Sequence, residues 1–304
     1  MTPSQIGATA AYPFAYFGVN GTFDNYVWCF HRLAELGFEN FNLEILEDEQ
    51  VDLFTPERVD HFRRLGEEYG IKLPIFTAYY AENDLVSLSP ERRKIGLEKF
   101  RFSVETAKRL GSTIMNMASE FPPELVTKYR SEYVHSPADE FWVPLQVSWQ
   151  SIWDAQVQVI QACADMAAER GMTLSLEPRA KCIVSTTDSF LRLADHVDRP
   201  NFGCSLDIMH THFHHEDIPT SIKKLDSLLI DIQIADADGQ TLSLLPIGKG
   251  NINFPVAIRA LNEIDFQGIL GLGILVGNID EGYLNSRLAL EDLINKTPAE
   301  TARA

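Results

Sequence analysis

The fold is decided by the stretch CSLDIMH at residues 204–210, where an aspartate and a histidine follow directly on an apolar run. Residues 202–206 are apolar enough to predict a buried strand, and Asp207 closes it. His210 comes three residues later and leads into a polar, histidine-rich segment. Parallel α/β proteins present metal ligands and acid–base groups at the carboxyl ends of their strands. An aspartate that only caps the next turn, above a histidine that is only packed, would give the same sequence pattern. The rest of the chain is therefore needed to distinguish a functional strand end from a structural one.

The rest of the chain repeats this unit of strand and polar loop. Apolar runs predict eight strands, at residues 14–19, 38–45, 71–78, 113–118, 172–176, 202–206, 228–235 and 269–274. N-caps, first-turn prolines and closing glycines predict helices at residues 25–36, 55–70, 89–110, 149–170, 187–199, 218–224, 254–264 and 283–294. Such βαβ units predict an α/β fold, a single-domain (β/α)₈ TIM barrel over residues 1–304. A doubly wound sheet is the alternative, but no G-x-G-x-x-G motif follows a strand.

Composition excludes several classes of partner. The 304 residues carry a formal net charge of −17 and no Lys/Arg-rich stretch, so neither nucleic acid nor an anionic membrane is expected to bind. The four cysteines form no C-x-x-C pair, which favours buried free thiols over a disulfide framework. Residues 1–13 lack the features of a signal peptide, and no apolar run approaches the roughly 18 residues of a membrane span. We therefore expect a soluble cytoplasmic protein.

Polar residues stand at the carboxyl ends of the predicted strands, and a barrel would gather them at one mouth. Glu177, Asp207 and Gln233 end three consecutive strands. Their two carboxylates and one amide oxygen suit a divalent ion such as Mn²⁺, Mg²⁺ or Co²⁺. The alternative is a hydrogen-bonded polar mouth that binds a sugar without a metal.

Other residues near this mouth have predicted roles toward a substrate. His210 would be an acid–base group, or a further metal ligand or its neighbour. Glu44 and Asn116, at the ends of two other strands, would contact the substrate. Arg179 would clamp a hydroxyl, carboxylate or phosphate, unless it forms an ordinary surface ion pair.

The connection at residues 119–148 is much longer than usual between a strand and a helix, and we expect a lid or a substrate loop there. Within it, His135 is a candidate acid–base group. Trp142 is a candidate for stacking on a sugar ring, although it could equally anchor the loop. The small, polar tail at residues 297–304 is expected to be frayed.

Five short motifs, in chain order, resemble one known family. The motifs are Asn42-Leu43-Glu44, Leu176-Glu177-Pro178, Asp207-Ile208-Met209-His210, Gln233-Ile234-Ala235-Asp236 and the segment PIGKGNINF at residues 246–254. In that order they resemble the sugar isomerase/epimerase-like superfamily, the xylose isomerase-like barrels, over nearly the whole chain.

The resemblance implies a metal site with one departure from the family pattern. Family members hold the metal with Glu, Asp, His and Glu after strands five to eight. Glu177 and Asp207 match the first two positions, and Gln233 stands at the third, as in the family's dehydroshikimate-dehydratase-like branch. Gly273 stands at the fourth, so no carboxylate is available there unless residues 280–281 reach in.

The resemblance therefore implies a divalent-metal-dependent isomerase or epimerase acting on a sugar or keto-sugar. Because no carboxylate stands at Gly273, a one-base lyase is an alternative. Such a lyase would be a dehydratase that acts on a cyclic polyol or a keto acid, or a subunit of an enzyme that cleaves carbon-glycosides. A catalytically silent barrel that binds a ligand or a partner is another alternative. Family members self-associate or work with a small second subunit, so a homo-oligomer and such a partner are both open here.

Overall fold

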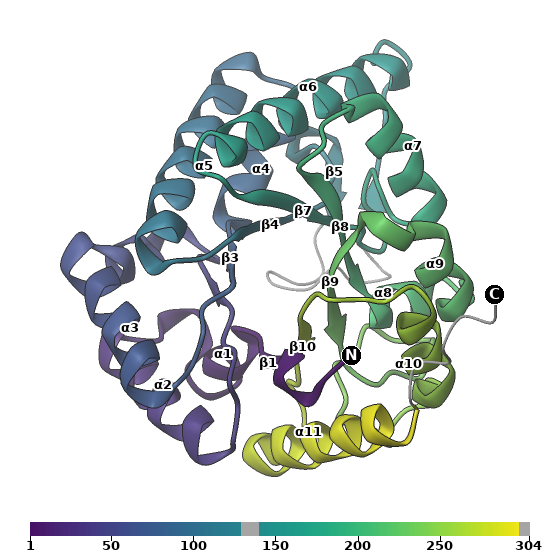
Figure 1. Ribbon diagram of the computed structural model, residues 1–304. Helices are drawn as coiled ribbons and strands as arrows, with labels where there is room; N and C mark the ends of the chain where they lie inside the picture. The colour runs from purple at the N-terminus through teal and green to yellow at the C-terminus, as the bar shows by residue number, and fades with distance from the viewer. Residues whose placement is uncertain (129–139, 298–304) are drawn as a thin grey trace.

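The computed structural model describes residues 1–128 and 140–297, and eight parallel strands form its barrel (Figure 1). A parallel bridge between Ala8 and Phe41 joins the first strand to the segment that leads into the second, which closes the ring. The predicted (β/α)₈ barrel is confirmed. In their order around the ring the strands are β1 (Ile6–Ala8), β2 (Leu43–Glu44), β3 (Ile75–Thr77), β4 (Ile114–Ala118), β7 (Thr173–Glu177), β8 (Phe202–Asp207), β9 (Leu229–Ile234) and β10 (Leu270–Leu272).

Helices surround the barrel on its outside (Figure 1). Their ends follow the sequence signals: α5 begins after Ser89, whose side chain accepts a hydrogen bond from the Arg92 N–H, and ends at Gly111 with φ 87°. The helices are α1 (Ala11–Phe17), α2 (Phe23–Glu35), α3 (Pro56–Tyr69), α4 (Glu82–Leu85), α5 (Pro90–Leu110), α6 (Trp149–Ala168), α7 (Thr187–Val197), α8 (Ile208–Phe213), α9 (Ile218–Leu225), α10 (Phe254–Glu263) and α11 (Ile279–Lys296).

The prediction of a first strand at residues 14–19 was wrong. These residues lie in α1 and in the 3₁₀ turn Gly18–Asn20, while the first strand is β1. Their aromatic character reflects helix packing, because Tyr16 lies edge-on against Trp28 of α2, with ring centroids 5.1 Å apart. Strand β1 has only three residues, too few to show a period of its own.

The long connection contains a hairpin that was not predicted. Strands β5 (Val126–Lys128) and β6 (Glu140–Phe141) pair antiparallel, outside the barrel sheet. Phe121 packs against Phe141 with ring centroids 4.6 Å apart, and this contact attaches the hairpin close to the end of β4. A lid role for residues 119–148 stays a prediction, and the tail after Thr297 lies outside the described residues.

Polar side chains fill the centre of the barrel beneath its mouth. Asn116 donates to the Ser175 hydroxyl at 2.9 Å, and Ser205 donates to the Asp231 carboxylate at 2.6 Å. Burial raises the pKa of Asp231 to about 7. These side chains form a hydrogen-bonded floor beneath the mouth of the barrel.

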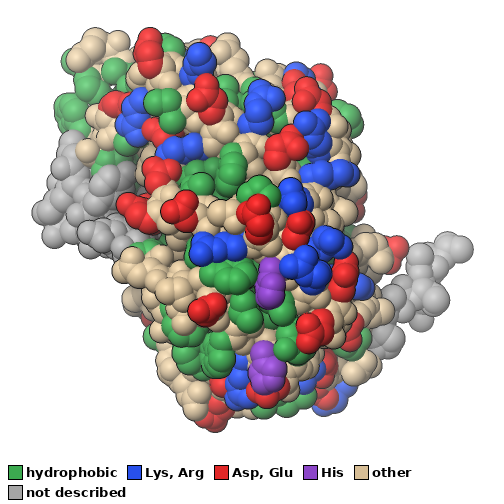
Figure 2. Space-filling view, turned by 90° about the vertical axis from the view of Figure 1, so that its left-hand side faces the viewer, with side chains coloured by type: hydrophobic (Ala, Val, Ile, Leu, Met, Phe, Trp, Pro, Cys, Tyr) green, Lys and Arg blue, Asp and Glu red, His purple; other side chains and the backbone are tan. Residues whose placement is uncertain are grey.

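Charges of both signs are mixed on one face of the surface (Figure 2), and the cysteines lie inside the protein. Figure 2 shows one face on which Lys and Arg side chains alternate with Asp and Glu instead of gathering into a basic patch. All four cysteines are buried and free, as predicted. Among the described residues, none of the helices has the length and apolarity needed to cross a bilayer.

Asp280, at the start of the last helix α11, connects it to the first two helices, α1 and α2. Its carboxylate accepts hydrogen bonds from Tyr12 at 2.6 Å, Tyr16 at 2.7 Å and the Arg32 Nε at 2.7 Å. Burial alone would raise the pKa of Asp280, but these donors and the charge of Arg32 lower it below its ordinary value. Asp280 therefore joins α1, α2 and α11 and is not among the residues that line the central cavity.

We expect Asp280→Asn to lower the free energy of unfolding at pH 7 by about 2 kcal/mol, because charged hydrogen bonds are lost from a mostly buried site. The folded pKa of Asp280 lies below the unfolded value. Its stabilisation is therefore present above pH about 4 and is lost as the pH falls through the folded pKa. Urea denaturation of wild type and variant, at neutral and acidic pH, should show a difference that narrows in acid.

Asp292→Asn is the matched control, because Asp292 lies on the same helix and is 57% exposed in an ion pair with Lys296. It should change stability by less than about 0.5 kcal/mol. Equal effects of the two substitutions would show that Asp280 does not join the helices in this way.

Candidate active site

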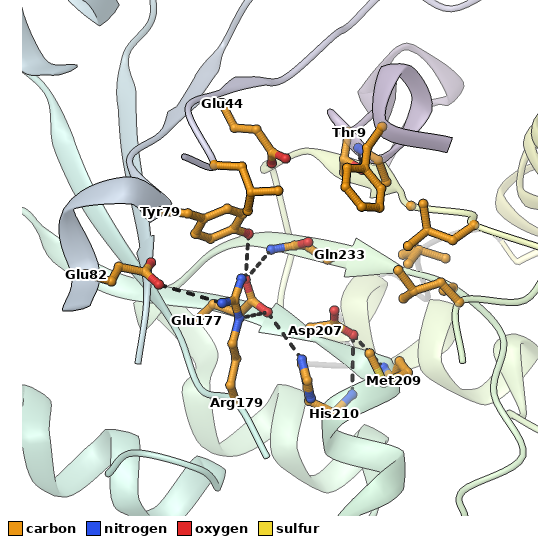
Figure 3. A pocket seen from close by; sticks show the side chains of 18 of the residues that line it. Thr9, Glu44, Tyr79, Glu82, Glu177, Arg179, Asp207, Met209, His210 and Gln233 are labelled. Atoms are coloured by element: carbon orange, nitrogen blue, oxygen red, sulfur yellow. Dashed lines mark hydrogen bonds and ion pairs between the residues drawn. The ribbon is translucent and has the colours of Figure 1, made fainter. Parts of the chain in front are cut away.

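The strand ends open into one cavity of about 550 Å³ (Figure 3). It lies at the carboxyl ends of the strands, where active sites of TIM barrels are found. The polar or titratable side chains that line it are Thr9, Glu44, Glu47, Tyr79, Glu82, Asn83, Glu120, Glu177, Arg179, Asp207, His210 and Gln233, and Gly273 lines it as well.

Strand register brings the predicted metal ligands together. Asp207 of β8 lies beside Gln233 of β9, and Glu177 ends the neighbouring strand β7. Asp207 also caps α8, because its Oδ1 accepts the N–H groups of Met209 at 2.7 Å and His210 at 3.4 Å. The carboxylate that caps α8 is thus also a predicted metal ligand. Its second oxygen, Oδ2, accepts no hydrogen bond from the described residues.

The Glu177 carboxylate is surrounded by donors. Its Oε2 accepts from the Tyr79 hydroxyl at 3.0 Å and from the Gln233 Nε2 at 2.8 Å. Arg179 donates through Nε to Oε1 at 3.0 Å and through Nη2 to Oε2 at 3.4 Å. Burial would raise the pKa of Glu177, but the charge of Arg179 and these hydrogen bonds lower it. Glu177 is therefore held ionised and fixed in place.

Arg179 is an internal cation and not a surface ion pair. Its side chain is 18% exposed, lies over the Tyr79 ring at 4.3 Å, and approaches Glu82 at 3.7 Å. Glu82 in turn accepts a hydrogen bond from the Ala118 N–H. Tyr79 and Glu82 were missed in the sequence, although both follow directly on the predicted strand at residues 71–78.

His210 is buried and turns one nitrogen to the cavity side. Its Nδ1 lies 3.4 Å from the Ala180 N–H, which it accepts, and its Nε2 lies 3.6 Å from the Glu177 Oε1. With Nδ1 as an acceptor, the neutral imidazole carries its proton on Nε2. In this form His210 can donate a hydrogen bond toward the cavity.

The donor set of this cluster fits a divalent ion. Glu177, Asp207 and His210 each offer one ligand atom, and these atoms lie within 4.8 Å of one another. No carboxylate stands at Gly273, and Asp280 is engaged with Tyr12 and Tyr16. An ion bound to Glu177 would replace at least one of its present donors, because both of its oxygens already accept hydrogen bonds.

The other predicted site residues have different surroundings. Glu44 lines the cavity, as predicted. Asn116 does not line this cavity but lies in a small adjoining one with Gln233, where it donates to Ser175, and its role as a substrate contact stays a prediction. Trp142 is 66% exposed and is also not among the lining residues. His135 lies outside the described residues.

Comparison with known proteins agrees with this fold. The chain belongs to the xylose isomerase-like TIM barrel family, whose model matches residues 30–293. It is 22% identical over 265 residues to L-ribulose 3-epimerase of Methylomonas sp. strain DH-1, which covers 84% of this chain and 81% of that protein. The resemblance inferred from the sequence motifs is confirmed.

Solved structures share the whole barrel. A D-tagatose 3-epimerase-like protein is similar with a TM-score of 0.75 and 19% identity, covering 96% of this chain and 98% of that one. The IolI protein, whose crystal structure contains a bound zinc atom, is similar with a TM-score of 0.72 and 18% identity, over 96% of this chain and 98% of that one. At such identities these structures show a common fold.

We expect Arg179→Gln to destabilise the protein by about 3 to 5 kcal/mol, because it leaves the buried Glu177 carboxylate without its cation. Glu177→Gln should relieve part of this loss in the double variant, since no uncompensated charge remains. A double-mutant cycle measured by urea denaturation should therefore give a coupling energy above about 1 kcal/mol.

The exposed pair of Arg170 and Glu105, 2.6 Å apart, provides the control cycle. Its coupling energy should stay below about 1 kcal/mol, as is usual for surface pairs. If both cycles gave the same small value, Arg179 would not be the counter-charge of Glu177.

Proposed function

We propose that this protein is a divalent-metal-dependent isomerase or epimerase that acts on an unphosphorylated sugar or keto-sugar. The observation that carries the proposal is the Glu177–Asp207–His210 cluster, whose ligand atoms lie within 4.8 Å of one another at the barrel mouth. The adjoining cavity of about 550 Å³ falls in the range of about 300 to 1,000 Å³ that small-molecule sites occupy. The relatives named as epimerases support the same reading.

The charge of the cavity supports a neutral substrate. Its described lining includes six carboxylates against a single guanidinium, that of Arg179. Arg179 is already engaged by Glu177 and Glu82. A phosphorylated sugar would bring further negative charge into this field, whereas hydroxyl groups can donate hydrogen bonds to carboxylates.

Glu177 and Asp207 would hold the ion, with the Gln233 amide beside them, and a bound ion would make the hydrogen next to a substrate carbonyl more acidic. The chain's own residues would carry out the proton transfer. A carboxylate of the wall formed by Glu177 and Asp207 takes a proton from the carbon beside the carbonyl. The C–H electron pair forms a C=C bond, and the carbonyl pair moves to oxygen, which gives an enediolate.

His210 is placed to donate a hydrogen bond to that oxygen through Nε2. Return of the proton to the other face of the same carbon gives an epimer, and return to the neighbouring carbon gives an isomer. A lyase would instead expel a group from the enediolate. Product mass distinguishes the two reactions, because isomers keep the mass of the substrate.

We expect purified protein to bind about one divalent ion per chain, because the Glu177 and Asp207 carboxylates with the Gln233 amide beside them form a donor set that suits such an ion. Asp207→Ala should lose this ion, and Glu49→Ala, an exposed carboxylate outside the cavity, should keep it. Elemental analysis after dialysis against Mn²⁺, Co²⁺, Mg²⁺ or Zn²⁺ measures both. Wild type that takes up none of the four ions contradicts the metal site and favours a silent, ligand-binding barrel.

We expect neutral ketoses to be converted at least about tenfold more efficiently, as kcat/KM, than the same sugars carrying a phosphate, because like charges in a cavity cost binding energy. The measurement is a panel of ketoses and their phosphates, with products separated by chromatography and weighed by mass spectrometry. Preference for a phosphorylated member would show that the acidic lining does not govern substrate choice.

A further inference from the structure

Glu44 stands on the side of the mouth opposite Asp207. Strands β2 and β8 are separated by four steps in the ring of eight strands, which is the greatest separation that the ring allows. Glu44 ends β2 and Asp207 ends β8, so each carboxylate enters the cavity from its own side. Figure 3 shows Glu44 pointing into the cavity across from Asp207 and His210.

The Glu44 carboxylate is free, unlike the other carboxylates at the strand ends. No hydrogen bond or ion pair reaches it from the described residues, whereas Glu177 is held by Arg179, Tyr79 and Gln233. An unpartnered carboxylate in a partly buried position is costly for the fold. Such a cost is typical of residues that serve a ligand and not the scaffold.

Glu44 is also the titratable strand-end residue on its half of the mouth. The other strand ends on this half carry Thr9, just after β1, Gly273, just after β10, and Thr77, at the end of β3, and none of these exchanges a proton near neutral pH. Side chains larger than glycine would be crowded at position 273, where a Cβ would lie 3.1 Å from the Thr9 Oγ1. Among the strand-end residues of this half, Glu44 is therefore the one suited to acid–base chemistry.

We propose that Glu44 is a catalytic acid–base residue that works with the wall of Glu177 and Asp207 on opposite faces of one substrate carbon. This inference rests on the proposed function and makes it more specific, since it selects epimerisation over one-base reactions. Burial raises the pKa of Glu44 to about 7, with Arg179 lowering it and Glu177 raising it. A group with such a pKa is available near neutral pH both as the acid and as the base.

The two-sided reaction balances. One carboxylate removes the proton from the carbon beside the carbonyl, and the C–H pair becomes the C=C bond of the enediolate while the carbonyl pair moves to oxygen. The carboxylic acid on the other side then delivers its proton to the opposite face of that carbon, and the oxygen pair re-forms the carbonyl. The substrate is inverted, and the two carboxyl groups have exchanged protonation states, which solvent restores.

The test is solvent-deuterium exchange by Glu44→Gln, an isosteric change, in protein loaded with its preferred ion. The variant should convert one epimer into the other about 10² to 10⁴ times more slowly than wild type. It should still exchange the carbon-bound hydrogen of the epimer whose hydrogen faces Asp207, because that half-reaction needs only the opposite wall. Exchange from the other epimer should be lost. The readout is mass spectrometry or proton NMR of each recovered epimer in D₂O.

Exchange lost equally from both epimers would overturn the proposal and show that Glu44 only positions the substrate. Unchanged conversion would overturn it as well. Glu49→Gln, an exposed carboxylate five positions further along, is the matched control and should behave like wild type. Wild type that converts no sugar at all would instead contradict the proposed function, so the two failures are distinguishable.

Discussion

The site depends on one buried carboxylate that the protein must neutralise. Glu177 is 2% exposed, and such a group is tolerated only when its oxygens are fully hydrogen-bonded. Its donors come from three separate places: Tyr79 after β3, Arg179 just beyond β7, and Gln233 on β9. One carboxylate therefore orients three segments of the barrel mouth at once. Because both Glu177 oxygens already accept hydrogen bonds, a metal ion would have to compete with Arg179 for them.

The sequence predicted the barrel and the side of the mouth around Asp207, because each of these features is local. A buried parallel strand is an apolar run, and the polar residue that ends it is visible without knowledge of the neighbours. Glu177, Asp207, Gln233 and His210 were found in this way, and the structure brings them together. Their partners depend on which loops meet across the ring, so the sequence carried no comparable signal for them.

The misses have the same physical origin. Asn116 was predicted at the mouth, but it lies two residues before the end of β4, on the inward face and one layer deeper in the barrel. Strand β1 escaped notice because its few residues are held in place by their neighbours and not by a pattern of their own. Tyr79 and Glu82 lie in short helical turns after β3, where no periodicity reveals a function. Sequence patterns report burial well, and they report depth along a strand and contacts between loops poorly.

The hairpin of β5 and β6 has a consequence for how such a barrel can diversify. Lys128 and Glu140 are backbone partners, so positions 128 and 140 lie side by side at one point of the scaffold. The contact of Phe121 with Phe141 anchors that point near the cavity. Because closing a loop costs only slowly more as it lengthens, residues can be inserted or exchanged there with little effect on the barrel. Insertions and substitutions between positions 128 and 140 can therefore vary while the pairing of the barrel strands stays unchanged.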